Sequence, residues 1–436
     1  MGSEPAGRPA AGGPGAEAEH RGGTGPARPA GGVHEDRLRG RRRPGLPRRD
    51  RDVPDLDEHP AGRQRVPGGA DHRPGAGPAA DRRRPGHRLR HLEVAGATPR
   101  ELGLSRGAAL RGSLGGAYTK YAELFRVLGV DEERERDGVA RVVSALRGWR
   151  PGLLEQFEGI AEGAGVELSQ VVALNARTEI IALGEKPSSE CSTLTAEIGD
   201  HRYGVQTWDW HVELDPFWHT HTVSGPGLRY AGLTEQGILS KIGVNEAGLA
   251  LHFNILGHRE DRPDGVPMHV LSSVVLSECR SVDEAIELIR EAPIASSSAF
   301  TMLDAQRAVS VEMSPAGVFV IEAVAGSVQR TNHFQHETPL AAQKSEIYEP
   351  DSSERLALVR ARLAEGLPVA PGDLVRVLLT EEGEPPLTCR ADMSKGYGDR
   401  WATLATLITD PEARTIRILD GMPTEAETGE WRTLTV

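Results

Sequence analysis

The sequence predicts an α+β fold in which helices pack against antiparallel sheets. Residues 91–185 carry apolar residues at three- and four-residue spacing, which is the pattern of amphipathic helices. From Cys191 onwards, apolar and polar residues alternate with a period of two, and turn signals such as Gly199-Asp200 interrupt the alternation. Blocks of helical and strand pattern then succeed one another, so helices and strands are expected in separate layers.

The block before Cys191 is expected to be almost wholly helical. Thr98 is followed by Pro99 and Glu101, which predicts a helix start, because Thr accepts backbone hydrogen bonds at the N-cap and Pro fits the first helical position. Ser169 as a cap and Gly184 as a stop predict one further helix between them.

After Cys191 the pattern alternates between sheet and helix. Strand patterns occupy three segments, which are 191–256, 297–334 and 401–436. Helical patterns occupy the segments 267–292, 352–366 and 370–383. The first of these is one helix or two in tandem, and Ser281 is expected to cap the second.

The first ninety residues have a different composition from the rest. They contain no aromatic residue and no Ile, Lys, Asn or Cys, while Arg, Pro, Gly and Ala dominate. Such a segment cannot bury enough apolar surface to offset its ordering entropy, so residues 1–90 are expected to be a disordered extension outside the fold. Translation of a GC-rich gene from a start placed too early also gives this composition.

Charge and cysteine content exclude several classes of protein. The net charge is -12, and residues 1–90 hold about nineteen Arg against about twelve acidic residues, so the remainder is acidic by about nineteen. A body this acidic repels a phosphate backbone, so no nucleic-acid partner is expected. No apolar run is long enough for a membrane span or a secretory signal, and three cysteines leave one thiol free, so a reducing, cytoplasmic location is expected.

Cys191 differs in its surroundings from the other two cysteines, Cys279 and Cys389. It begins a strand directly after a polar loop, and small hydroxyl residues flank it on both sides. A thiolate can be solvated and used there, whereas Cys279 and Cys389 are expected to be buried structural residues.

A cysteine nucleophile needs a base, and two arrangements supply one. His201 or His211 can form a Cys-His relay in an intact chain. Alternatively, cleavage of the Glu190–Cys191 bond makes Cys191 a new N-terminus whose α-amine titrates near about 7.7–8.0 and serves as the base. The change from helical to strand pattern falls at Cys191 and favours the second arrangement.

A set of short motifs occurs in a characteristic order around this cysteine. They are LNARTEI (174–180), Cys191-Ser192-Thr193, QTWDW (206–210), KIGVNEAGLALHFNIL (241–256), SSSAFTMLDA (296–305), RTNHF (330–334) and TCRA (388–391). Each motif is weak alone, but the ordered set over residues 91–430 resembles the isopenicillin-N acyltransferase family, the C45-type N-terminal-nucleophile hydrolases.

The resemblance implies a four-layer αββα sandwich and a precursor that cuts itself before Cys191. It implies one catalytic domain, 91–436, made of a helical α chain, 91–190, and a β chain, 191–436. Cys191 is then the nucleophile, Asp209 lies near its amine, and Asn332 supplies an oxyanion-hole amide. Contacts with substrate are expected from three further residues, which are Arg390, Trp210 and Ser298.

The expected reaction is acyl transfer from an N-acyl amide or acyl thioester to an amine or water, through a thioester on Cys191. Familiar members have Gly before the cysteine, whereas this chain has Glu190, although Gly gives the scissile peptide more freedom. No metal or organic cofactor is expected. Coenzyme A thioester is a candidate co-substrate, the other partners are an acyl donor and an amine acceptor, and a homo-oligomer is compatible with the sequence.

Two rival functions are weighed against this interpretation. His211, His219 and His221 form a histidine-rich segment that can be read as the zinc site of a metal-dependent hydrolase, although their spacing matches no specific zinc motif. A non-catalytic protein that kept the fold is the other rival, and the joint presence of Cys191, Asp209 and Asn332 argues against it.

Overall fold

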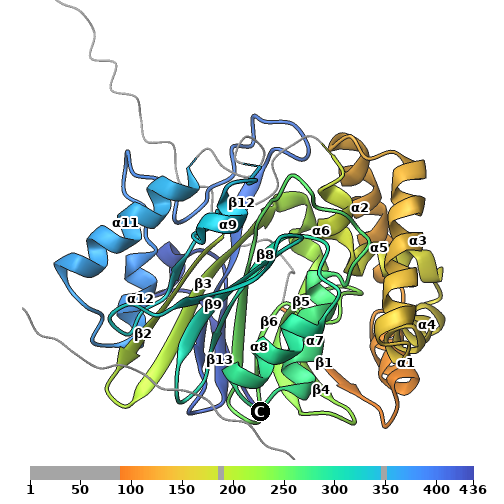
Figure 1. Ribbon diagram of the computed structural model, residues 1–436, viewed down its shortest axis with the longest axis horizontal. Helices are drawn as coiled ribbons and strands as arrows, with labels where there is room; N and C mark the ends of the chain where they lie inside the picture. The colour runs from red at the N-terminus through yellow and green to blue at the C-terminus, as the bar shows by residue number, and fades with distance from the viewer. Residues whose placement is uncertain (1–88, 185–190, 345–350) are drawn as a thin grey trace, which may run out of the picture. The chain divides into compact units, whose positions relative to one another are not determined.

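Two β-sheets stacked face to face form the centre of the fold (Figure 1). The computed structural model describes residues 89–184, 191–344 and 351–436. The eight-stranded sheet has the order β1 (His91–Ala95), β4 (Trp218–Ser224), β5 (Tyr230–Glu235), β6 (Ile242–Asn245), β7 (Ala250–Ile255), β8 (Ser298–Leu303), β9 (Ala308–Ser314) and β10 (Gly317–Glu322). The six-stranded sheet has the order β11 (Gln329–Arg330), β2 (Ser192–Ile198), β3 (His201–His211), β12 (Trp401–Asp410), β13 (Thr415–Asp420) and β14 (Trp431–Thr435).

Helices cover the outer face of each sheet. The helices α7 (Met268–Glu278) and α8 (Val282–Glu291) lie on the eight-stranded sheet, while α11 (Ser352–Glu365) and α12 (Pro371–Val377) lie on the six-stranded sheet (Figure 1). The order of layers is therefore helix, sheet, sheet, helix. The predicted four-layer α+β sandwich is confirmed.

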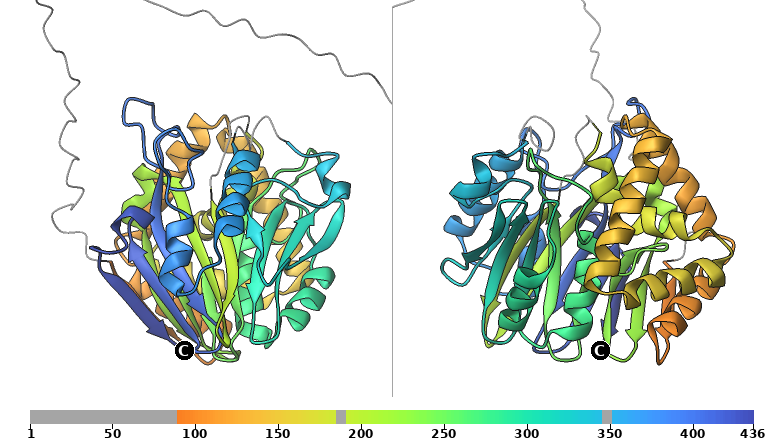
Figure 2. Two further views of the ribbon diagram at one scale, coloured as in Figure 1. Left: turned by 90° about the vertical axis from the view of Figure 1, so that its left-hand side faces the viewer. Right: turned by 45° about the vertical axis from the view of Figure 1, so that its right-hand side comes forward.

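A group of helices from the first part of the chain packs beside the sheets, as Figure 2 shows. These helices are α1 (Pro99–Ala109), α2 (Leu114–Val127), α3 (Glu132–Trp149), α4 (Gly152–Ala164), α5 (Leu168–Asn175) and α6 (Arg177–Ile181). Short elements complete the described fold, and they are α9 (Glu337–Leu340) and the 3₁₀ turns Val212–Phe217 and Pro423–Glu425.

Two helices of this group, α1 and α4, cross so closely that their backbones lie against each other. A Cβ atom added to Gly103 of α1 would lie 2.1 Å from the carbonyl oxygen of Gln156 and 2.9 Å from Cα of Gly159 in α4. Backbone atoms cannot move aside as a flexible side chain can. Glycine is therefore required at this crossing.

Local predictions hold where side chains bind the adjacent backbone. The Thr98 hydroxyl accepts a hydrogen bond from the Glu101 amide at 3.2 Å, and Ser281 caps α8 by accepting one from the Glu284 amide at 3.2 Å. The tandem segment is thus two helices, α7 and α8.

Two expectations for the block before Cys191 are wrong. Residues 91–95 are a strand, β1, which pairs in parallel with β4 and so joins the eight-stranded sheet. The helix expected from Ser169 to Gly184 is two helices, and Glu167 with Gln170 forms the capping box of the first. The break follows Asn175, whose buried side chain bonds Gly237 O at 2.8 Å and the Leu239 amide at 3.0 Å, on another segment.

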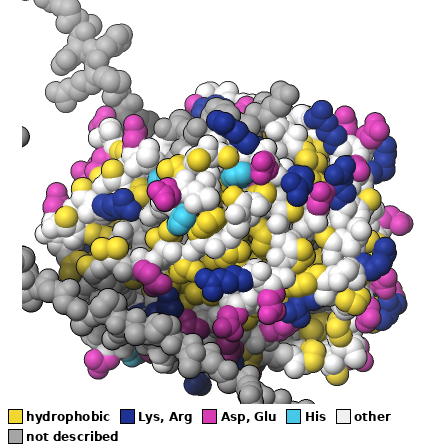
Figure 3. Space-filling model, in the orientation of Figure 1, with side chains coloured by type: hydrophobic (Ala, Val, Ile, Leu, Met, Phe, Trp, Pro, Cys, Tyr) yellow, Lys and Arg dark blue, Asp and Glu magenta, His cyan; other side chains and the backbone are white. Residues whose placement is uncertain are grey.

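The surface and the helices bear on possible partners. On the face in Figure 3, Lys and Arg side chains lie among Asp and Glu side chains, so positive and negative charges are mixed. No helix within the described ranges has the length and apolarity that a membrane crossing requires.

Candidate active site

Cys191 lies immediately before β2, at the end of the six-stranded sheet where β3 carries its tryptophans. It is 2% exposed, and its Sγ atom lies 3.8 Å from the carbonyl oxygen of Asp209. The antiparallel register pairs Ser192 with Thr207, which brings the start of β2 alongside this part of β3.

Side chains from three other segments hold the backbone of Cys191. Its amide N donates to Oδ1 of Asn332 at 2.8 Å. Its carbonyl oxygen accepts from Nδ2 of Asn254 at 2.9 Å and from Nη1 of Arg355 at 3.2 Å. Both polar atoms of this residue's backbone are therefore fixed by side chains.

Asn332, two residues after β11, has its side chain held from both ends. Its Oδ1 accepts from Nη2 of Arg355 at 3.1 Å as well as from Cys191, and its Nδ2 donates to Ile255 O at 3.0 Å. The Asn332 backbone amide donates to Oγ of Ser352 at 2.7 Å. These partners orient the carboxamide toward the Cys191 amide.

Asn254 and Arg355 were missed at the level of sequence. Asn254 lies on β7, which faces β2 across the two sheets, and its Oδ1 accepts from the Thr193 hydroxyl at 2.9 Å. Arg355 is fully buried on the inner side of α11, beside Leu356 and Val359, and its Nε donates to Asp351 at 2.8 Å. The sequence did contain one signal for Arg355, which is an arginine on the apolar face of a predicted helix.

Asp209 lies opposite the tryptophans that flank it. It is fully buried, and its Oδ1 accepts from the Thr403 hydroxyl at 2.5 Å, across the β3–β12 pair. Trp208 and Trp210 face the other way and both lie against Lys241, with ring centroids 4.2 Å and 5.7 Å from its Nζ. The side chains of this segment therefore alternate between the two faces of the strand, as the period of two requires.

The structure places the remaining predicted site residues in different surroundings. Trp210 is buried and its Nε1 donates to the Tyr121 hydroxyl at 2.9 Å. Ser298 is buried at the start of β8, opposite Ile255. Arg390 is exposed, with Nη2 3.4 Å from the Thr424 hydroxyl. Glu190 lies outside the described residues. The contacts thus unite Cys191, Asp209 and Asn332, and they place Arg390 at the surface.

A buried group of charges lies behind the two tryptophans. Glu235, the last residue of β5, accepts from Nε and Nη2 of Arg177 at 3.2 Å and 2.8 Å and also from the Tyr121 hydroxyl and the Lys241 ammonium. Burial alone would raise the pKa of Glu235, but Arg177 and Lys241 outweigh it and lower this pKa to about 2. Burial, followed by repulsion from Arg177, lowers the pKa of Lys241 to about 7.

The histidines of the rival interpretations do not form a metal site. His211 stacks on Trp401 at 3.9 Å, and within the described part of the chain neither of its ring nitrogens has a hydrogen-bond partner. His219 and His221 are buried in β4, and Nη1 of Arg106 lies 3.3 Å from His221 Nδ1, where a cation would repel a metal. Burial lowers the pKa of His211 to about 3, so it is neutral and isolated from Cys191.

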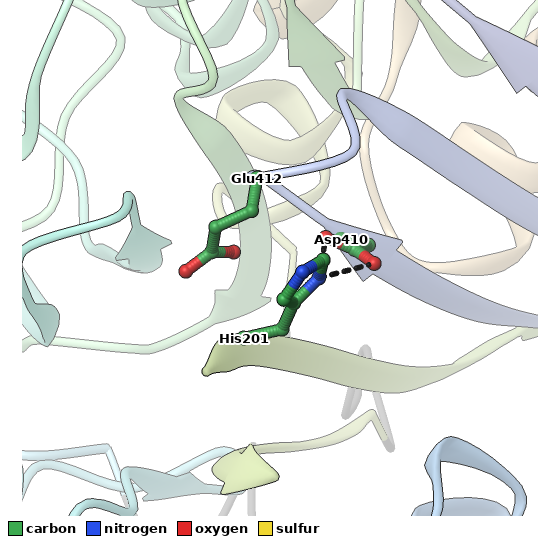
Figure 4. Close-up of side chains that lie close together, drawn as sticks. All are labelled: His201, Asp410 and Glu412. Atoms are coloured by element: carbon green, nitrogen blue, oxygen red, sulfur yellow. Dashed lines mark hydrogen bonds and ion pairs between the residues drawn. The ribbon is translucent and has the colours of Figure 1, made fainter. Parts of the chain in front are cut away.

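His201 cannot be the base for Cys191, because it lies at the other end of β2. The register pairs it with Ile198, and seven residues at about 3.3 Å each separate the two ends of the strand by about 20 Å. At that end, His201, Asp410 and Glu412 lie close together (Figure 4). Nδ1 of His201 is 3.1 Å from both carboxylate oxygens of Asp410, which makes an ordinary, partly exposed ion pair.

Comparison with solved structures finds related enzymes of low identity. An N-acylethanolamine-hydrolyzing acid amidase ortholog of Caenorhabditis elegans is 14% identical with a TM-score of 0.38, over 56% of this chain and 100% of that one. A variant of conjugated bile acid hydrolase from Clostridium perfringens is 10% identical with a TM-score of 0.40, over 56% and 92%.

Sequence comparison is more informative. The acyl-coenzyme A:6-aminopenicillanic-acid-acyltransferase 40 kDa form of Emericella nidulans is 29% identical over 333 residues, which is 75% of this chain and 91% of that protein. The family model of acyl-coenzyme A:6-aminopenicillanic acid acyl-transferase matches residues 196–425, more than half of the chain. The protein therefore belongs to this family and is an enzyme of the acyltransferase class.

Proposed function

We propose that the protein is a self-processing cysteine acyltransferase or amidohydrolase with Cys191 as its nucleophile. The observation that carries the proposal is the hydrogen bond from the Cys191 amide to Asn332, in a site that also holds the Cys191 carbonyl through Asn254 and Arg355. A residue with an ordinary packing role does not need three polar side-chain contacts to its backbone. A nucleophile does, because reaction requires fixed geometry.

Self-processing would convert the Cys191 amide into the catalytic base. Cleavage of the Glu190–Cys191 bond leaves an α-amine at the position where the amide N now donates to Asn332. An α-amine titrates near about 7.7–8.0, so it can take the thiol proton at neutral pH. The chain would then consist of an α part, 1–190, and a β part, 191–436.

The proposed reaction proceeds through a thioester. The Sγ atom bonds to the acyl carbon of an amide or thioester while the α-amine takes the thiol proton and passes it to the leaving group. Water or an amine then attacks the thioester carbon, the C–S bond breaks, and the proton lost by the attacking water or amine passes through the α-amine to sulfur. The proposed reaction uses no metal or organic cofactor.

The oxyanion of each tetrahedral intermediate requires a neutral donor. Nδ2 of Asn332 carries two N–H groups, and the proposal assigns one to Ile255 O, as observed, and the other to the oxyanion. Loss of one such donor typically costs about two to four kcal/mol of transition-state stabilisation.

The name of the Emericella relative suggests an acyl-coenzyme A donor and an amine acceptor. For this chain we propose the broader class of N-acyl amides and acyl thioesters as donors, with an amine or water as acceptor. Fold and family do not narrow this further, because related sites act on different acyl groups.

Intact mass spectrometry after incubation with a panel of acyl amides and acyl thioesters tests the proposal. We expect fragments of about 190 and about 246 residues, with the acyl mass on the second. Cys191→Ala should remain a single chain without adduct, while Cys279→Ala, which removes another buried thiol, should behave as wild type. Activity in Cys191→Ala refutes the proposal, and an active, uncut wild-type chain refutes self-processing.

A further inference from the structure

Lys241 is a lysine with no exposed surface in a largely aromatic cage. It precedes β6, and its Nζ donates to Glu235 and lies 4.2 Å from the ring centroid of Trp208 and 5.4 Å from that of Phe253. Burying an ammonium group costs free energy unless an anion compensates it. The buried ammonium group of Lys241 therefore requires a negative charge nearby.

Glu235 alone does not balance the charge of Lys241, because other donors already bond its carboxylate. Arg177 contacts it with two N–H groups, and the Tyr121 hydroxyl donates to it as well. Arg177 is a permanent cation that by itself neutralises Glu235. Lys241 is thus a second cation beside a single carboxylate, and the pair Arg177 and Lys241 leaves one positive charge in excess.

Cys191 is an acidic group on a segment beside this cage, because the register pairs Ser192, the residue after it, with Thr207, the residue before Trp208. Trp208 and Trp210, which lie against Lys241, flank Asp209, whose carbonyl oxygen is 3.8 Å from the Cys191 Sγ atom. Phe253 of the cage is followed by Asn254, which holds the Cys191 carbonyl. Against burial and Arg177, Glu235 raises the pKa of Lys241, and a negative charge on Cys191 raises it further.

We propose that Lys241 is a positioning residue whose ammonium group is the buried counter-charge of the Cys191 thiolate. It stabilises the negative charge that forms on sulfur when the α-amine takes the thiol proton, and it does so without contacting substrate. The inference rests on the proposed function, in which Cys191 is the nucleophile.

Most other groups around Lys241 are fixed in charge near neutral pH, and the exception is Glu179, because burial raises its pKa to about 7. Glu235 remains ionised because its pKa is lowered to about 2. Tyr121 and His269 remain neutral, because burial raises the first pKa and lowers the second. Arg177 stays charged, and His211 is neutral. Glu179 accepts hydrogen bonds from the Met268 amide and the Ser296 hydroxyl. The carboxylate of Asp209 faces Thr403.

The first test measures the rate of Cys191 alkylation by iodoacetamide against pH in the full chain, with peptide mass spectrometry to identify the thiol. Lys241→Gln keeps an N–H donor for Glu235 but removes the charge, and Lys241→Arg keeps the charge. We expect the midpoint of the profile to rise by about one pH unit or more in Lys241→Gln, with about tenfold slower alkylation near neutral pH, and to stay close to wild type in Lys241→Arg. Lys120→Met, at an exposed lysine, is the matched control.

An unchanged profile in a folded Lys241→Gln protein overturns the inference. A second measurement needs no substitution at Lys241, because the chain has only five lysines and their ¹³Cε resonances can be followed by NMR. Cys191→Ala should lower the pH at which Lys241 titrates, and an unchanged titration also overturns the inference. Activity retained in Cys191→Ala would instead refute the proposed function, so the two failures are distinguishable.

Discussion

Glu179 provides the clearest test of the buried electrostatics, through Glu179→Gln. Its side chain on α6 is 3% exposed, and Oε1 accepts from the Met268 amide at 2.9 Å and from the Ser296 hydroxyl at 3.2 Å. Within the described ranges, Oε2 is buried without a hydrogen-bond partner. Burial outweighs the two hydrogen bonds and raises the pKa of Glu179 from 4.5 to about 7.

The sign of the effect on stability follows from this shift. The folded protein keeps the Glu179 proton up to about pH 7, whereas the unfolded chain releases it near pH 4.5. The contribution to the free energy of unfolding is therefore full below about pH 4.5 and is lost as the pH rises through about 7, by about 3 kcal/mol. Gln cannot ionise, so the variant lacks this loss.

The assay is urea unfolding at a series of pH values between about 4 and about 8. Cys191→Ala serves as the common background, which keeps the chain in one piece. The stability of Glu179→Gln relative to its parent should increase by about 3 kcal/mol across this range, whatever its absolute value at low pH. The exposed Glu155→Gln is the control and should give a constant difference. A constant difference for Glu179→Gln would refute the assignment of a neutral, buried carboxyl.

Three further predictions concern the oxyanion donor, the helix crossing and the rival metal site. Asn332→Ala should lower kcat by about 10²–10³-fold, measured with the donor found by mass spectrometry, while thermal stability shows whether the fold is kept. Gly103→Ala should destabilise the protein by about 1–3 kcal/mol in urea unfolding, because its Cβ meets backbone 2.1 Å away, and a neutral result would contradict the close crossing. Dialysis against EDTA should leave acyl transfer unchanged, since His211, His219 and His221 do not gather, and reactivation by zinc would restore the metal-hydrolase interpretation.

Local signals predicted the parts of the fold that depend on neighbouring residues. Thr98 and Ser281 cap helices because their hydroxyls need only the next turn of backbone. The alternation around Asp209 placed its carboxylate and the two tryptophans on opposite faces, because a strand has a period of two. Motif order predicted Cys191, Asp209 and Asn332 as site residues. The Cys191 amide bonds Asn332 and its Sγ atom lies near the backbone carbonyl of Asp209, while their catalytic roles stay predictions.

Contacts between distant segments were beyond such signals. The strand β1 exists because β4, more than a hundred residues later, offers an edge for parallel pairing. The helix break after Asn175 depends on its bonds to the Gly237–Leu239 segment. Arg355 shows the same limit at the site, because its helix was predicted while its target, the carbonyl of Cys191, is 164 residues away.

The groups around Cys191 come from distant segments, which determines at what stage of folding the proposed self-cleavage can occur. Asn254 comes from the eight-stranded sheet, Asn332 follows a strand of the six-stranded sheet, and Arg355 comes from the helix that covers the latter. These groups meet only when the two sheets and the outer helix are packed together. If these contacts supply the strain and orientation that self-cleavage needs, an incompletely folded chain cannot release the Cys191 amine. The Cys191 thiol would then become reactive only after folding is complete, when it is already buried in the protein.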